Sequence, residues 1–236
     1  MFGGFYMRGF YFDYTYFLVL LGALICGIAS ANVNRTYRKY SKFSNVRGLT
    51  SQAVASMILQ SAGIYDVRIE VIKGNLTDHY SPNEKVLRLS QTVYDSTSVV
   101  AIGVAAHECG HAIQHQEEYF PLKLRSFSVP LAKVGSWISW PVIIAGLIFG
   151  MLGLARIGIF LFSFVVLFQL VTLPVEFNAS NRAVKILEQS NILYGDELEG
   201  ASKVLRAAAM TYVAALFSTV LQLLRLVLIV GRRNDR

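Results

Sequence analysis

Charged residues are scarce in this sequence. Asp, Glu, Lys and Arg make up 16% of the 236 residues, whereas about a quarter is usual in soluble domains. Hydrophobic residues make up 54%, and they gather into a few long runs. This pattern excludes an ordinary soluble protein with a large core and indicates a chain that crosses a membrane.

Cysteine is nearly absent, and acidic residues are outnumbered by basic ones. The two cysteines, Cys26 and Cys109, lie in unrelated surroundings, so we infer no disulfide framework and favour a reducing compartment for the polar part. The net charge of +7 suits an anionic membrane surface. No basic patch is interleaved with aromatic residues in the way that reads bases, so we expect no nucleic-acid partner.

Four apolar runs are long enough to cross a hydrocarbon core of about 30 Å. They are residues 14–31, 134–153, 157–175 and 207–230. The aromatic segment before the first run holds only Arg8 and Asp13 as charges, which is a poor signal-peptide start, so we predict an uncleaved anchor with aromatic side chains at the interface. We predict that Ala155 and Arg156 join the two middle runs in a tight hairpin. Arg225, inside the last run, should face other helices, a water-filled cavity or the interface.

The polar remainder, residues 32–130 and 176–206, is predicted to form a small α+β portion within one membrane-embedded domain over residues 1–236. Helical patterns cover 50–62, 96–115 and 176–190. Residues 65–74 and 85–90 alternate apolar and polar side chains as strands do, with turn residues Pro82 and Asn83 between them. These two strands predict a small β-hairpin.

Basic residues near the apolar runs predict the orientation in the membrane. One side carries five of them: Arg8, Arg156, Arg232, Arg233 and Arg236. The side that holds both polar segments carries twelve: Arg35, Arg38, Lys39, Lys42, Arg47, Lys123, Arg125, Lys133, Arg182, Lys185, Lys203 and Arg206. We therefore expect the polar part to lie in the cytoplasm, at the plasma membrane.

His107, Glu108 and His111 form an H-E-x-x-H motif in the predicted helix 96–115. Residues at i and i+4 share one helix face, so the two imidazoles can hold one zinc ion. The glutamate can then take a proton from a water molecule that the zinc activates. The alternative is a pair of structural histidines, but it leaves the acidic residue between them on an apolar helix without explanation.

A catalytic zinc usually has three protein ligands. Glu176 is a candidate because it directly follows an apolar run, where a carboxylate without a partner is costly; an ordinary glutamate at a helix start is the equal alternative. His79 and His115 are rival ligands. Ser180 shares the face of Glu176 and is expected to bond a ligand. His79 and Tyr80 are candidate donors to the oxyanion of a tetrahedral intermediate, although an ordinary turn also explains them.

Several segments together make the chain resemble the YugP-like neutral zinc metallopeptidases, a family of small bacterial membrane proteins. They are TYRKYSK, LTDHYSP, GVAAHECGHAIQH, PLKLRS, LFQLVTLPVEFNASNRA, KVLRAAAMTYVAAL and LQLLR. The resemblance implies a gluzincin-like site, with zinc on His107, His111 and Glu176 and with Glu108 as general base. It implies a mainly α, multi-span membrane protein with a small α+β zincin-like catalytic portion.

Two residues depart from the pattern of that family. Cys109 stands where alanine is usual, and because this position points off the histidine face, we expect it to be tolerated. Asn178 stands where aspartate is usual, which weakens any role of that carboxylate in orienting a ligand. Neither change removes a ligand or the base.

These features predict a membrane-bound zinc endopeptidase that cleaves membrane or juxtamembrane proteins with zinc-activated water. The strand at 85–90 is predicted to bind an extended substrate along its edge. The alternative is an inactive membrane scaffold with a structural zinc site, although such sites usually have four protein ligands. A metal transporter is disfavoured, because the spans offer few polar ligands.

Overall fold

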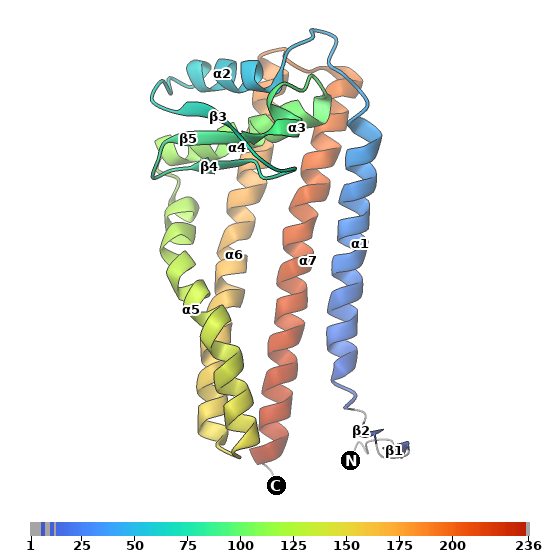
Figure 1. The fold of residues 1–236 in the computed structure, drawn as a ribbon, viewed down its shortest axis with the longest axis vertical. Coiled ribbons are helices and arrows are strands. Elements are labelled where there is room, and N and C mark those ends of the chain that lie inside the picture. Colours follow the sequence, from blue (N-terminus) through green and yellow to red (C-terminus); the bar gives the residue numbers. More distant parts are fainter. Residues whose placement is uncertain (1–5, 8–9, 12, 235–236) are drawn as a thin grey trace. The chain divides into compact units, whose positions relative to one another are not determined.

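The computed structural model describes residues 6–7, 10–11 and 13–234 (Figure 1). Most of the aromatic segment before the first span, together with Arg8 and Arg236 of the orientation argument, lies outside these residues. The chain divides into two compact units. The first comprises Met1–Ile28, Phe127–Leu170 and Tyr212–Arg236, and the second comprises Ala29–Ser126 and Val171–Thr211.

Four long helices carry the apolar runs. They are α1 (Tyr16–Tyr40), α5 (Phe120–Ile148), α6 (Leu152–Gln189) and α7 (Gly195–Asn234). Each is long and apolar enough to cross a membrane, with mean hydropathy of 1.5 to 2.3 over its most apolar stretch. The predicted multi-span, mainly α architecture is therefore confirmed.

The long helices differ from the prediction in where they begin and end. The segment 176–190 continues α6 without a break, and the helix passes through Pro174. The hairpin between α5 and α6 turns at residues 149–151, where Gly150 has a φ of +69°. The turn lies at Gly150 because a glycine adopts a left-handed conformation without the steric cost that other residues bear. Ala155 and Arg156, which were predicted to form the turn, lie inside α6 instead.

Small residues allow close helix packing in the first unit. A Cβ atom on Gly158 of α6 would lie 2.9 Å from the backbone nitrogen of Ile143 in α5, so only glycine fits there. Ile143 packs in a buried cluster with Phe162 and Leu226. The Arg225 guanidinium lies 4.2 Å from the ring centroid of Tyr16 in α1. This arginine therefore faces another helix, which is one of the environments predicted for it.

A three-stranded sheet belongs to the second unit. It consists of β3 (Arg68–Ile72), β4 (His79–Ser81) and β5 (Val86–Ser90), in the order β3-β5-β4. The hairpin joins β4 to β5, whereas β3 pairs with β5 in parallel. The prediction took residues 65–74 as the first strand of the hairpin, whereas the first strand is β4. Because β4 has only three residues, it shows no alternation of apolar and polar side chains that would reveal it. The residues of β5 at both ends are buried, as in a central strand.

The central place of β5 overturns one expectation. A central strand has no free edge, so residues 85–90 cannot bind an extended peptide by adding a strand. Among the described strands of this sheet, β3 and β4 form the edges.

Short helices and the sheet enclose the core of the second unit. Helix α2 (Ser51–Ser61) is capped by Thr50, whose side chain accepts from the Ala53 N–H at 3.3 Å. Helix α3 (Gln91–Tyr94) follows β5, and α4 (Val99–Gln116) packs against α2.

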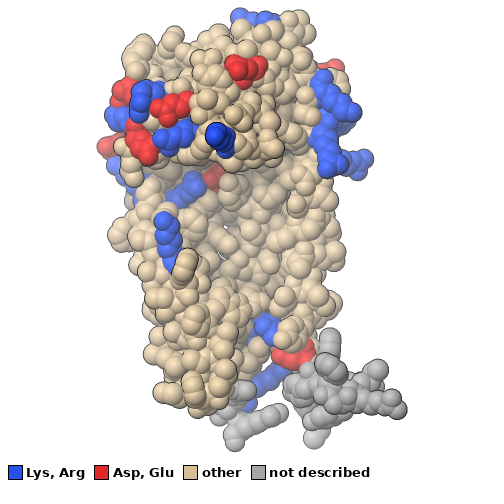
Figure 2. Space-filling model, in the orientation of Figure 1, with Lys and Arg blue, Asp and Glu red and all other residues tan. Residues whose placement is uncertain are grey.

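A pair of short strands, β1 (Tyr6–Met7) and β2 (Phe10–Tyr11), lies near the N-terminus, in the first unit. On the face drawn in Figure 2, most charged side chains lie over the sheet and short helices of the second unit.

Candidate active site

The two motif histidines lie on α4, a helix whose residues are mostly buried. Ser98 caps the helix by accepting from the Ala101 N–H at 3.1 Å. His107 and His111 are one turn apart, and their ring centroids are 4.7 Å apart. Both rings keep some exposure, with 16% and 11% of the side-chain surface accessible. A helix fixed by a buried core therefore presents both imidazoles on one partly open face.

A glycine lets α4 and α6 approach each other at the site. A Cβ atom on Gly110 would lie 2.7 Å from the backbone oxygen of Ala179 in α6. Since real side chains do not tolerate such a contact with a backbone, this position in α4 requires glycine. The close approach places Glu176, three residues before Ala179, opposite the histidine pair.

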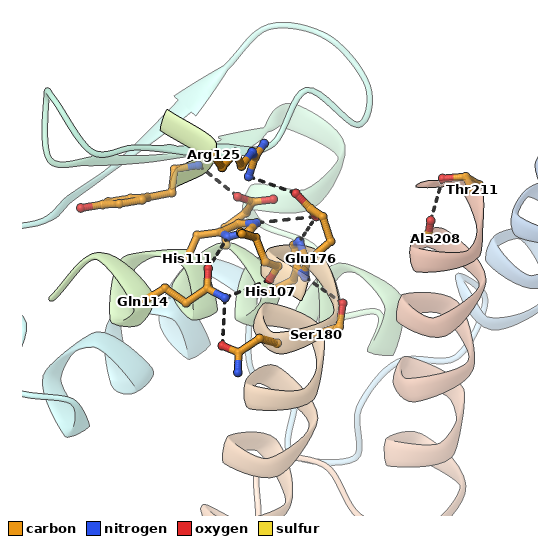
Figure 3. A network of polar contacts seen from close by, with 12 residues as sticks. His107, His111, Gln114, Arg125, Glu176, Ser180, Ala208 and Thr211 are labelled. Atoms are coloured by element: carbon orange, nitrogen blue, oxygen red, sulfur yellow. Dashed lines mark hydrogen bonds and ion pairs between the residues drawn. The ribbon is translucent and has the colours of Figure 1, made fainter. Parts of the chain in front are cut away.

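Glu176 completes a cluster of three metal-ligating side chains (Figure 3). Its Oε2 atom lies 3.4 Å from His107 Nε2 and 3.8 Å from His111 Nε2. The ligand atoms of the three residues lie within 4.8 Å of one another, and the Glu176 side chain is only 3% exposed. The structure thus brings together His107, His111 and Glu176 and leaves the rival ligands, His79 and His115, outside this cluster.

The other ring nitrogen of each histidine has its own partner. His111 Nδ1 lies 3.0 Å from Gln114 Oε1, and Gln114 Nε2 donates to the Val175 carbonyl at 2.9 Å. That second bond fixes which end of the amide faces the ring, so His111 carries its proton on Nδ1 and presents the lone pair of Nε2 to the cluster. His107 Nδ1 lies 3.1 Å from Ser180 Oγ, which confirms the expected contact of Ser180.

Arg125, like Gln114, is a residue of this site that sequence reasoning missed. Its Nη1 atom lies 3.1 Å from Glu176 Oε1, the oxygen that does not face the histidines. The guanidinium compensates the charge of a nearly buried carboxylate and fixes the orientation of its plane (Figure 3). In the sequence Arg125 was only one of the basic residues in the orientation argument.

Asn178 belongs to a chain of polar contacts that connects Gln114 with Arg182 and Glu117. Its Oδ1 atom accepts from Gln114 Nε2 at 2.9 Å and from Arg182 Nε at 2.8 Å. Arg182 also pairs with Glu117, with 2.6 Å between Nη2 and Oε2. A single amide oxygen thus receives both donors, where an aspartate would supply a charged acceptor to the same two groups.

The motif glutamate faces the sheet. Glu108 Oε2 accepts from the backbone N–H of Tyr80 at 3.0 Å, and this residue lies in the edge strand β4. The Tyr80 hydroxyl lies 2.9 Å from His115 Nδ1. His79 Nδ1 lies 2.9 Å from the Thr77 carbonyl. Both candidate oxyanion donors therefore belong to the strand that touches the general-base candidate.

Burial and charge act differently on the ionisable groups of α4. Burial alone would lower the pKa of His107, but its hydrogen bond to the Glu176 carboxylate and the charges of Glu108 and Glu176 together raise it. For His111 burial prevails and lowers the pKa. Burial raises the pKa of the Cys109 thiol, which stays protonated and donates to the Ala55 carbonyl at 3.6 Å, away from the histidine face as expected.

The donor set fits a zinc ion. Two imidazole nitrogens and one carboxylate oxygen form a common ligand set of catalytic zinc in proteins. The nitrogens are free to ligate, since both Nδ1 atoms have other partners, and the carboxylate shares its second oxygen with Arg125. This is the arrangement in which neighbouring residues orient the ligands of a metal.

Comparison with known proteins agrees with this geometry. The family model described as "Putative neutral zinc metallopeptidase" matches residues 15–231. The chain belongs to this family. It is 45% identical over 207 residues to a protein of Bacillus subtilis (strain 168) named "Putative membrane protease YugP", and the match covers 88% of this chain and 92% of that protein. No solved structure matches the chain.

Membership in the zinc metallopeptidase family confirms the resemblance seen in the sequence. The match spans both units and all four long helices. The relative's name and the four apolar helices identify a membrane protein of a protease family.

Proposed function

We propose that this protein is a membrane-bound zinc endopeptidase. The observation that carries the proposal is the buried cluster of His107, His111 and Glu176, with the carboxylate of Glu108 on the same helix as the histidines. The three ligands come from α4 and α6, and each has a partner that orients it. When bound, zinc lowers the pKa of a water molecule and polarises a carbonyl oxygen.

In the proposed mechanism, Glu108 acts as general base and then as general acid. Its carboxylate takes a proton from the attacking water and passes that proton to the leaving amine. The Tyr80 N–H, which donates to Glu108 Oε2, holds the carboxylate in place before substrate binds. Arg125 keeps Oε1 of Glu176 away from the histidines, so that Oε2 is available as a ligand.

An oxyanion donor is proposed in β4. Burial first, and the charge of Asp66 second, raise the pKa of Tyr80, so its phenol keeps its proton at neutral pH. A protonated phenol can donate to a developing oxyanion, with His79 as the neighbouring candidate. The Tyr80 hydroxyl would exchange its bond to His115 for one to the substrate.

The substrate is proposed to be a membrane protein or its juxtamembrane segment. An extended peptide can pair with the free edge of β4, whose Tyr80 N–H points toward α4 and not toward β5. Glu176 directly follows the apolar stretch of α6, so the ligand belongs to the same helix as a candidate span. The excess of basic residues in the second unit supports a cytoplasmic position for the site.

The test compares the wild-type protein with Glu108→Gln after purification in detergent, measuring bound zinc and cleavage of an unfolded protein such as casein. Glutamine preserves the acceptor for the Tyr80 N–H but cannot take a proton. We expect stoichiometric zinc in both proteins and a loss of about 10²–10⁴-fold in cleavage rate for the variant. Equal cleavage by both would refute the role of Glu108.

The same measurement addresses the inactive scaffold with a structural zinc. That function predicts zinc in both proteins, no cleavage in either, and a fold that loosens when a chelator removes the metal. The family match favours the enzyme.

A further inference from the structure

A basic hollow of about 440 Å³ lies between α1 and α7 in the second unit. Nine residues line it, and four of them are cations: Arg35, Lys39, Lys203 and Arg206. No acidic residue lines it. The cations are spaced i, i+4 on α1 and i, i+3 on α7, so each pair projects from one helix face. In Figure 2, Lys and Arg side chains gather at the edge of the molecule where Figure 1 draws the end of α1.

A tight contact beside the hollow brings the two helices together. A Cβ atom on Gly200 of α7 would lie 2.7 Å from the Tyr40 ring, so the glycine makes room for the tyrosine of α1. The Tyr40 ring attracts an ammonium group from each wall, with Lys39 Nζ at 5.0 Å and Lys203 Nζ at 6.0 Å from the centroid. The cations are thus held around a shared space.

The positive charge of the hollow is mostly uncompensated. Lys203 pairs with Glu199 one turn away. Within the part of the chain that the structure describes, Arg35, Lys39 and Arg206 have no carboxylate at ion-pair distance. Four cations around one space repel each other, and an anion with several oxygens would satisfy their donors together.

The chain changes from polar to apolar at this position in both helices. In α1 the apolar run ends at Ala31, next to the lining residue Asn32, and in α7 it begins at Ala207, which lines the hollow with Met210. Such a change of polarity marks the level of lipid phosphate groups, and basic pockets between spanning helices bind anionic head groups. We propose that the hollow binds the phosphate of an anionic phospholipid, with Ala207 and Met210 toward its acyl chains.

The test measures phospholipid binding to the full chain in detergent by native mass spectrometry. Phosphatidylglycerol, phosphatidylcholine and inorganic phosphate are supplied separately. The variant Arg35→Gln with Lys39→Gln removes two charges from the hollow. Its matched control, Arg38→Gln with Lys42→Gln, removes the same two residue types at the same sequence spacing, from exposed positions outside the hollow in the last turn of α1 and in the turn that follows it. Arg206→Gln tests the opposite wall.

We expect one tightly bound phosphatidylglycerol on the wild-type protein, with affinity at least tenfold lower in the double variant and in Arg206→Gln and within about threefold in the control. Thermal unfolding without added lipid checks that all variants fold. Equal losses in the double variant and the control would overturn the site, because general surface charge would then explain binding. Equal binding of phosphatidylcholine, or inorganic phosphate bound as tightly as the lipid, would overturn the anionic lipid as its ligand.

Discussion

Arg125 connects the start of α5 to the third candidate ligand. A carboxylate that is 3% exposed is costly to bury unless its charge is compensated and both oxygens have partners. The guanidinium takes Oε1 of Glu176, while Oε2 faces the two histidines. The arginine therefore acts as a positioning residue for the candidate ligand Glu176.

Replacing Arg125 is predicted to weaken zinc binding. In Arg125→Gln the Glu176 carboxylate loses its charged partner and its fixed orientation, so zinc affinity should fall by about 10–100-fold. Arg125→Lys keeps the charge but not the planar guanidinium, and its zinc affinity should lie between those of the wild type and Arg125→Gln. Competition with a chelator measures the affinity. Lys123→Gln, on the same helix turn and paired only with exposed Glu118, is the control; an affinity of Arg125→Gln within twofold of that control would contradict the prediction.

The sequence was sufficient for some residues of the site and insufficient for others. His107 and His111 follow from the motif spacing on a helix, whereas the residues alone left Glu176 evenly balanced with an ordinary helix-start glutamate, and the family resemblance favoured it as a ligand. Gln114 and Arg125 carry no such signal: a glutamine on a helix and an arginine near a membrane are ordinary. Their roles depend on how α4, α5 and α6 pack, which local spacing does not encode.

At the scale of helices, Gly110 sets the distance between α4 and α6. We predict that Gly110→Ala destabilises the fold by about 1–3 kcal/mol, because the new methyl group would contact the Ala179 backbone oxygen. It should also weaken zinc binding by moving Glu176 away from the histidines. Chemical denaturation and the chelator competition measure the two effects.

Gly103→Ala is the control for that experiment. It lies on the same helix, and its new Cβ atom would lie 3.3 Å from the Ala201 Cβ atom, so the contact needs relief of only a few tenths of an ångström. Both substitutions gain the same helix propensity, so their difference isolates the backbone contact. If Gly110→Ala were as stable as Gly103→Ala and bound zinc equally well, the close approach would not determine the site.

An ion pair ties the end of α4 to α6 and makes a pH-dependent contribution. The hydrogen bond from Arg182 lowers the pKa of Glu117 below its ordinary 4.5. Because the folded protein then binds this proton less readily than the unfolded chain, the contribution is complete above about pH 4.5 and is lost as the pH falls through the lower pKa of the folded state. The pair is partly exposed and therefore worth at most about 1 kcal/mol.

Glu117→Gln is predicted to lower the free energy of unfolding by at most about 1 kcal/mol at pH 7. The predicted effect disappears once the pH is well below 4, because Glu117 is then protonated in the wild type as well. Denaturation curves from pH 3.5 to 7 measure the difference from wild type. Glu188→Gln removes the same charge at an exposed position of α6, so its free energy of unfolding should change with pH as that of the wild type does. A difference for Glu117→Gln that does not change with pH would contradict the ion-pair origin.

At the scale of helices and strands, the hydrophobic pattern of the sequence was sufficient to predict some elements and not others. Long apolar helices are recognised because hydrophobicity over many residues is a strong signal. The continuation of α6 through Pro174 into polar sequence was missed, because a proline usually marks a helix end. Membrane helices nevertheless tolerate proline. The parallel pairing of β3 with β5 was also missed, since alternation identifies a strand but not its neighbour.

At the scale of the whole molecule, one candidate ligand, Glu176, and the proposed lipid hollow both belong to segments that continue directly from apolar helices. Glu176 follows the apolar stretch of α6, and the basic hollow lies at the polar ends of the apolar runs of α1 and α7. This placement supports the proposal that the substrates are themselves held at the membrane.

The membrane topology is the last prediction. If all four helices span, the link between α5 and α6 lies on the side opposite the second unit, and the bias of basic residues puts the second unit in the cytoplasm. Single cysteines are placed at two exposed positions, Met151→Cys in the link and Tyr65→Cys in the second unit, after Cys26 and Cys109 are replaced by alanine. A membrane-impermeant maleimide added to intact cells should label only Met151→Cys and should label both after lysis. Labelling only of Tyr65→Cys would place the site outside the cell, and labelling of both in intact cells would contradict the four-span arrangement.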